Sequence, residues 1–160
     1  MTNVRNDQLL QDFYAAFAAR DGDRMAASYA PAATFSDPVF VGLHGAEPGA
    51  MWRMLTAQAT DLKVELLDRS TRDDRGAATW RATYTFSQTG RRVVNLVDSS
   101  FRFDNGLIAE QRDEFDFWRW ARQALGPLGL CLGWSPLVRG TVRRRARASL
   151  DRFLASHPGV

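Results

Sequence analysis

Two carboxylates stand out in this sequence because their settings would allow each of them to move a proton. Asp113 shares one parity of an alternating stretch with Gln111 and Phe115, and that face is expected to be covered and largely apolar. A carboxylate there is costly to desolvate unless it is paired, hydrogen-bonded or protonated, so its pKa should be raised if no cation is near. General acid/base chemistry is one consequence. The alternative is a buried structural Asp that a backbone amide, an indole or a tyrosine hydroxyl satisfies.

Asp37 is the second candidate, and it lies in a turn directly before Pro38. An aspartate at such a position often closes an Asx turn with its own backbone, which is the structural alternative for this residue. Two carboxylates without metal ligands or an activated nucleophile suit general acid/base work on a small apolar molecule. Candidate reactions are proton abstraction beside a carbonyl, aldol cyclisation and water addition.

The elements that must position these residues follow from the hydrophobic spacing. Apolar residues at helical spacing predict helices over 6–20, 24–29 and 45–57, and alternation predicts strands over 62–69, 77–87, 92–103 and 107–117. Asn105-Gly106 predicts a tight hairpin turn between the last two strands. Helices followed by an antiparallel meander predict an α+β fold with the helices packed on one face of a curved sheet.

Strand parity and helix position also select residues that would contact a ligand inside such a fold. Aromatic residues such as Tyr14, Trp52, Trp80 and Tyr84 are more often core residues than ligand contacts, although Tyr84 shares the covered face and could offer its hydroxyl. The candidates are Tyr14, Trp52, Trp80, Tyr84, Asn95, Ser99, Phe101, Gln111 and Phe115.

Length and composition narrow the class of protein. A chain of 160 residues with 45% hydrophobic and 24% charged residues suits one ordinary globular domain. Cys131 is the only cysteine and the only histidines are His44 and His157, so we expect no internal disulfide, metal site or cofactor. No apolar run approaches the ~18 residues that span a bilayer, and residues 1–7 are polar, so we expect a cytoplasmic protein.

The C-terminal part carries the basic surplus. From Phe117 onward there are eight arginines against Asp151 alone, a charge of +7, so the total of +3 leaves −4 for residues 1–116. A stripe from Val138 to Leu154 with arginines opposite predicts a helix that packs on its own domain or on a dimer mate. Contact of this basic helix with a membrane surface is a less favoured alternative. We expect no nucleic-acid partner, because no recognised motif or aromatic interleaving accompanies the charge.

Four stretches resemble the ketosteroid-isomerase-like group of the nuclear transport factor 2 superfamily, and within it the SnoaL-like proteins. They are FYAAF at 13–17, RDGD at 20–23, SDPV at 36–39 and VDSSFRF at 97–103. The resemblance implies a cystatin-like cone, a bent sheet wrapped round helices with an apolar pocket at one end. It further implies a cone domain over 1–117 with a C-terminal helical extension over 118–160, a homodimer through the exposed sheet face and no cofactor.

The resemblance also assigns roles by position. Asp37 occupies the place of the isomerase base, whereas the positions of the two oxyanion donors hold Phe13 and Ser99. Asp113 occupies the strand that carries an acid/base aspartate in polyketide cyclases and an aspartate in limonene epoxide hydrolases. The expectation is therefore a small apolar ligand and an isomerase, cyclase or epoxide hydrolase type of reaction that uses Asp113 and Asp37. The alternative is a non-enzymatic ligand-binding or dimerisation module.

Overall fold

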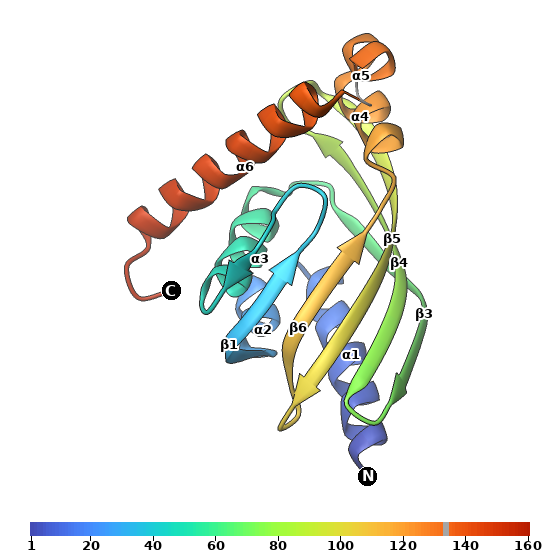
Figure 1. The fold of residues 1–160 in the computed structure, drawn as a ribbon, viewed down its shortest axis with the longest axis vertical. Helices are drawn as coiled ribbons and strands as arrows, with labels where there is room; N and C mark the ends of the chain where they lie inside the picture. Colours follow the sequence, from blue (N-terminus) through green and yellow to red (C-terminus); the bar gives the residue numbers. More distant parts are fainter. Residues whose placement is uncertain (133–134) are drawn as a thin grey trace.

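The computed structural model describes residues 1–132 and 135–160 (Figure 1). Its helices are α1 (Thr2–Ala18), α2 (Gly22–Ala27), α3 (Glu47–Gln58), α4 (Phe117–Leu125), α5 (Pro127–Leu132) and α6 (Pro136–Ser156). Its strands are β1 (Tyr29–Ser36), β2 (Leu43–His44), β3 (Lys63–Arg72), β4 (Arg75–Phe86), β5 (Arg91–Asp104) and β6 (Leu107–Glu114).

The six strands form one curved sheet in the order β2-β1-β6-β5-β4-β3. Neighbours are antiparallel except β1 and β6, which run parallel although four strands separate them along the chain. The first three helices lie on the hollow side of the sheet, and α6 runs along that side past α3 (Figure 1). This arrangement confirms the α+β class and the cone.

Local chemistry explains the hairpin that sets the register of β6. Asn105 and Gly106 both take positive φ, 51° and 78°, as a two-residue turn between twisted strands requires. The turn pairs Asp104 with Leu107, and further along the same ladder Ser99 pairs with Asp113. The turn predicted from the sequence therefore starts the ladder, and a one-residue shift between Arg102 and Phe103 then brings Asp113 opposite Ser99.

Strand parity is confirmed for β4 and β5 and corrected for the start and the end of β6. The register shifts after Arg102, so Ile108 rather than Leu107 is completely buried, because a bulge moves the alternation by one residue. The strand also ends at Glu114, earlier than expected, because Asp116 caps α4 through the backbone N–H of Arg119. Phe117 accordingly begins a helix and does not end a strand.

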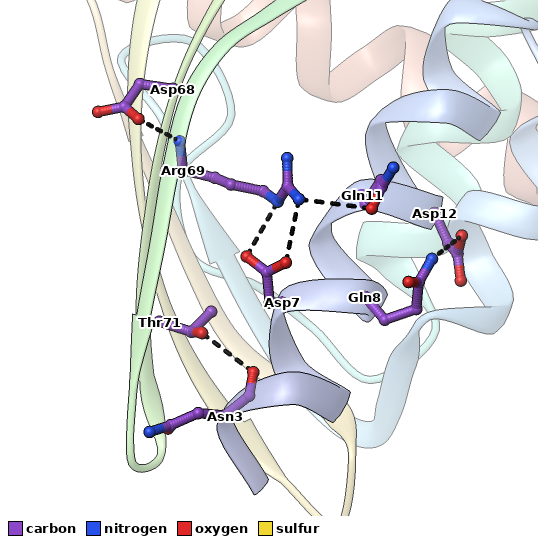
Figure 2. A network of polar contacts seen from close by, with 8 residues as sticks. All are labelled: Asn3, Asp7, Gln8, Gln11, Asp12, Asp68, Arg69 and Thr71. Atoms are coloured by element: carbon purple, nitrogen blue, oxygen red, sulfur yellow. Dashed lines mark hydrogen bonds and ion pairs between the residues drawn. The ribbon is translucent and has the colours of Figure 1, made fainter. Parts of the chain in front are cut away.

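Polar contacts hold α1 against β3 at the edge of the sheet (Figure 2). Arg69 of β3 donates to both carboxylate oxygens of Asp7, at 2.9 and 3.0 Å. Near the N-terminus, Thr71 donates to the backbone carbonyl of Asn3 at 3.1 Å. A two-point arginine–carboxylate contact fixes geometry as well as charge, so α1 has a defined position over the sheet.

The C-terminal helix α6 packs on the core of its own chain, which confirms one of the two placements expected for it. Leu150 is completely buried, and Ala146, Phe153 and Leu154 pack beside it against the main cluster. Arg147 donates to Glu47 at 2.6 Å and so connects α6 to the start of α3.

No helix among the described residues is long and apolar enough to cross a bilayer.

Candidate active site

Asp113 lies inside the cone on β6 and is only 3% exposed. One of its oxygens, Oδ1, accepts two hydrogen bonds, from the Ser99 hydroxyl at 2.6 Å and from the Gln111 amide at 3.0 Å. The first comes from the neighbouring strand and the second from the residue two positions back on the same face. No cation reaches the carboxyl within the described part of the chain, and its only ordered support is this pair of neutral donors.

Ser99 is fixed by two further donors. The Trp80 indole N–H donates to Ser99 Oγ at 2.8 Å, and the Tyr14 hydroxyl donates at 3.1 Å. An indole can only donate, so Ser99 Oγ accepts the hydrogen bond from Trp80. The hydroxyl hydrogen of Ser99 is then directed at Asp113. The sequence-based alignment placed Phe13 at this helix position, but it is Tyr14 whose hydroxyl reaches the site.

Gln111 is held in the same way on the other side. Its side-chain oxygen accepts a short hydrogen bond from the Tyr29 hydroxyl, which in turn accepts from the Trp52 indole at 2.7 Å. The Gln111 amide nitrogen is thereby turned toward Asp113. Sequence reasoning missed Tyr29, because the spacing assigned it to the end of a helix over 24–29, whereas it begins β1.

Two chains of hydrogen bonds, one through Ser99 and one through Gln111, decide which oxygen of Asp113 carries a proton. Each chain includes a tryptophan that can only donate, and both chains deliver a hydrogen to Oδ1. Oδ2 accepts no hydrogen bond from the described residues, and none of their fully buried side-chain oxygens lacks a partner, so Oδ2 must border space that water can enter. The exchangeable proton of this carboxyl therefore belongs on Oδ2.

The electrostatics agree with that assignment. Burial raises the pKa of Asp113 to about 7, against the lowering effect of the Ser99 and Gln111 hydrogen bonds and with a smaller raising effect from the charge of Asp37. Burial and the nearby Asp113 charge raise the pKa of both Tyr14 and Tyr29 well above the ordinary value, so both stay protonated and keep donating. Near neutral pH, Asp113 is thus present in both protonation states.

Asp37 serves both as a turn-closing residue and as a titratable group. Its Oδ1 accepts from the backbone N–H groups of Val39 and Phe40, each at 2.6 Å, so the turn expected as the structural alternative is present. Burial raises its pKa to about 6, although the two backbone bonds and the charge of Arg143 oppose the rise. Arg143 reaches this turn from α6 and donates to the Pro38 carbonyl at 2.9 Å.

Beyond Asp113 the inner wall becomes half-buried, and we call this part of the cone the rim. Its residues include Asp37, Tyr84, Asn95 and Phe115. The Tyr84 hydroxyl accepts from the Trp120 indole at 2.8 Å and donates to no described residue, and the Asn95 amide has no hydrogen-bond partner there. Burial raises the pKa of Tyr84, with a smaller effect from Asp37. The rim therefore holds free donors.

The predicted site residues thus fall into two groups. One group supports Asp113 directly or through one or two intermediate residues: Tyr14, Trp52, Trp80, Ser99 and Gln111. The other group has no hydrogen bond to this network: Tyr84, Asn95 and Phe115. Phe101 packs edge-on against Tyr14, with ring centroids 6.5 Å apart, and belongs to the core beneath the network.

Asn95 and Ser99 are four residues apart on β5, or about 13 Å along the strand. Asn95 would therefore meet a different part of a ligand from Asp113.

No group of three or more metal-ligating side chains occurs among residues 1–132 and 135–160. The two clearest hollows on the described surface lie away from Asp113. One, of about 620 Å³, borders the first turns of α1 and Gly106, and the other, of about 340 Å³, borders Asp7 and residues 66–69.

We compared the sequence and the fold of this chain with those of known proteins. Residues 10–111 match the SnoaL-like domain, and no curated protein matches the chain. An LEH-like epoxide hydrolase from M. tuberculosis superposes with a TM-score of 0.63 at 18% identity, over 85% of this chain and 96% of the other. A SnoaL-like protein from Jannaschia sp. CCS1, proposed to be a polyketide cyclase, superposes with a TM-score of 0.69 at 14% sequence identity, over 79% of this chain and 95% of the other. TsrD from Streptomyces laurentii superposes with a TM-score of 0.64 at 25% sequence identity, over 79% of this chain and 98% of the other. The match to the domain model covers most of the chain and the cone agrees with it, so the chain belongs to the SnoaL-like family.

Proposed function

We propose that this protein binds a small apolar ligand at the rim of the cone and transfers a proton on it with Asp113. Oδ2 of the carboxylate takes a proton from one atom of the ligand, and the resulting Oδ2–H returns it to another atom. Within one ligand this exchange balances without a cofactor and suits an isomerase or cyclase type of reaction. In an epoxide hydrolase type of reaction, Oδ2 takes the proton from a water molecule whose oxygen bonds to a ring carbon as the carbon–oxygen bond of the epoxide breaks, and a proton is delivered to the ring oxygen. Asp37 is the second carboxylate, and its negative charge contributes to the raised pKa of Asp113.

One observation carries the proposal: both hydrogen bonds to Asp113 reach Oδ1, and Oδ2 is left to a proton or a ligand. A purely structural carboxylate would be expected to have both oxygens satisfied. The pKa of about 7 adds that the group can donate and accept near neutral pH. The free Tyr84 hydroxyl and Asn95 amide would orient a polar atom of the ligand at the rim.

The similarity to an epoxide hydrolase and to a proposed polyketide cyclase supports acid/base chemistry as a class. Both likenesses are below 25% identity, so the substrate must come from experiment.

A second candidate is a ligand carrier without catalysis. The observation in its favour is that Asp113 is only 3% exposed and is held by two neutral donors, as a structural carboxyl would be. In a carrier, the rim would hold the ligand and the Asp113 network would only stabilise the cone.

The first test is native mass spectrometry of the protein purified without added ligand, with extraction and identification of any retained molecule. The identified molecule is then incubated with the protein in D₂O, and deuterium incorporation is followed. Catalysis predicts incorporation that Asp113→Asn abolishes, because asparagine can keep the two hydrogen bonds but cannot exchange a proton. Asp98→Asn is the matched control, since Asp98 is exposed on the outer face of β5 and contacts Thr79.

Equal incorporation by wild type and Asp113→Asn would overturn the catalytic role of Asp113. A retained ligand that neither reacts nor exchanges would favour the carrier. If no carbonyl- or epoxide-bearing molecule is bound or turned over, the acid/base proposal fails.

A further inference from the structure

Three exposed leucines lie on α5 and on the first turn of α6, two elements that meet α4 at one end of the molecule (Figure 1). Leu128 and Leu130 of α5 are 55% and 52% exposed, and Leu137 in the first turn of α6 is 82% exposed. We call these three residues the leucine tip. Single exposed leucines are common, but three on these two neighbouring elements concentrate exposed apolar area at one end of the molecule.

The chain that forms α4, α5 and most of α6 is rich in cations. Residues 117–150 contain seven arginines and no aspartate or glutamate. Among the described residues only Arg147 of these seven forms ion pairs, with Glu47 and Asp151. Arg144 and Arg145 are exposed on α6 and have no acidic partner there. The positive charge around the leucine tip is therefore available to an external anionic surface.

An aromatic side chain on α4 accompanies these arginines. Trp118 on α4 is half-buried, and the guanidinium of Arg122 lies over its ring at 4.7 Å from the centroid. Arg122 and Arg119 are both exposed. An exposed apolar tip, an amphipathic aromatic ring and surrounding arginines is the combination that proteins lying on membranes present to lipid.

We propose that the leucine tip docks on an anionic lipid surface. The leucines enter the boundary between headgroups and acyl chains, and the unpaired arginines contact lipid phosphates and acidic headgroups. A bilayer accounts for both the apolar and the basic part of this end, whereas an acidic polymer would use only the charge. The inference is independent of the reaction proposed above, since none of its residues belongs to the Asp113 network or the rim.

The test is co-sedimentation of the full chain with sucrose-loaded vesicles of phosphatidylcholine alone or of phosphatidylcholine with one quarter phosphatidylglycerol. We expect binding to the anionic vesicles that weakens as salt is raised and is much weaker on the neutral ones. Arg144→Gln with Arg145→Gln should weaken binding roughly 25-fold, at roughly five-fold for each arginine near the surface.

The decisive variant is Leu128→Gln, Leu130→Gln and Leu137→Gln together, which removes the apolar contact and keeps every charge. We expect at least a ten-fold loss of binding to the anionic vesicles. The matched control is Val4→Gln, at an apolar residue that is 75% exposed on α1 at the other end of the molecule, and this variant should bind as wild type does. Circular dichroism of each variant verifies that it is folded.

Two outcomes would overturn the proposal. Absence of binding to either vesicle at low salt is the first. Unchanged binding of the leucine variant, together with similar wild-type binding to polyglutamate, is the second, because it would reveal simple adsorption of a basic protein to any polyanion.

Discussion

Ser99 and Asp113 lie directly opposite each other on β5 and β6, and the Ser99 hydroxyl donates to Asp113 Oδ1 at 2.6 Å. Trp80 and Tyr14 both donate to Ser99, so the direction of this hydrogen bond is fixed. The buried carboxyl is thus supported by ordered neutral donors and not by a cation. Such support leaves its pKa high, because burial is opposed only by neutral hydrogen bonds.

Asp113→Asn should remove a loss of stability that the wild type shows as the pH rises. The Asp113 carboxyl has a pKa of about 7 in the folded protein, whereas its ordinary value, which applies to the unfolded chain, is 3.8. Between these two pH values the folded state holds a proton that the unfolded chain has lost. The free energy of unfolding of the wild type should therefore fall between about pH 4 and pH 7, by on the order of 4 kcal/mol from this group. The variant should lack this fall.

Urea unfolding at several pH values measures it. Asp98→Asn should follow the wild-type curve, and identical pH dependence in wild type and Asp113→Asn would contradict the raised pKa. Asp37 contributes a similar fall up to about pH 6 in both proteins, so only the difference between them is informative.

Ser99→Ala should raise the pKa of Asp113 further. The Ser99 hydrogen bond favours the charged carboxylate, and its loss should move the titration upward by about one pH unit. NMR of the ¹³C-labelled carboxyl follows this directly. Ser100→Ala is the matched control, because Ser100 is exposed on the other face of the same strand and should leave the titration unchanged. A downward movement in Ser99→Ala would exclude the network described here.

Leu150→Ala should cost about 2–5 kcal/mol of the free energy of unfolding, because a completely buried leucine leaves a cavity when truncated. The same change at Leu137, which is 82% exposed on the same helix, should cost almost nothing. Chemical denaturation of the two variants compares them. Equal stability of Leu150→Ala and Leu137→Ala would mean that α6 is not part of the core in solution.

The expected homodimer remains a prediction, and the outer face of the sheet offers a surface for it. Leu67, Val94 and Leu96 are between 38% and 50% exposed on that face. Sedimentation equilibrium should give about twice 18.0 kDa for the wild type and a monomer for Leu96→Arg. Leu128→Arg, at an equally exposed position on α5, should leave the dimer intact. A monomeric wild type would end this expectation.

Much of the fold could be predicted because its signals are local. Asn105-Gly106 specifies a turn by backbone preference alone, and alternation on β5 correctly assigns Val97, Ser99 and Phe101 to the covered face. The bulge in β6 could not be predicted, since an extra residue in one strand depends on the pairing with the other. The same holds for the end of β6, where the capping of α4 prevails over continued alternation.

The site shows the same division between local and long-range information. The sequence alone determined that Asp113 occupies a covered face and that its pKa would be raised, because both follow from period-two alternation and desolvation. It also showed the basic C-terminal part, since charge can be counted. Only the tertiary structure decided that Tyr14 and not Phe13 reaches Ser99, that Tyr29 holds Gln111, and that both chains converge on Oδ1. The Tyr14–Ser99 and Tyr29–Gln111 contacts join residues more than 80 positions apart, and no local preference encodes them.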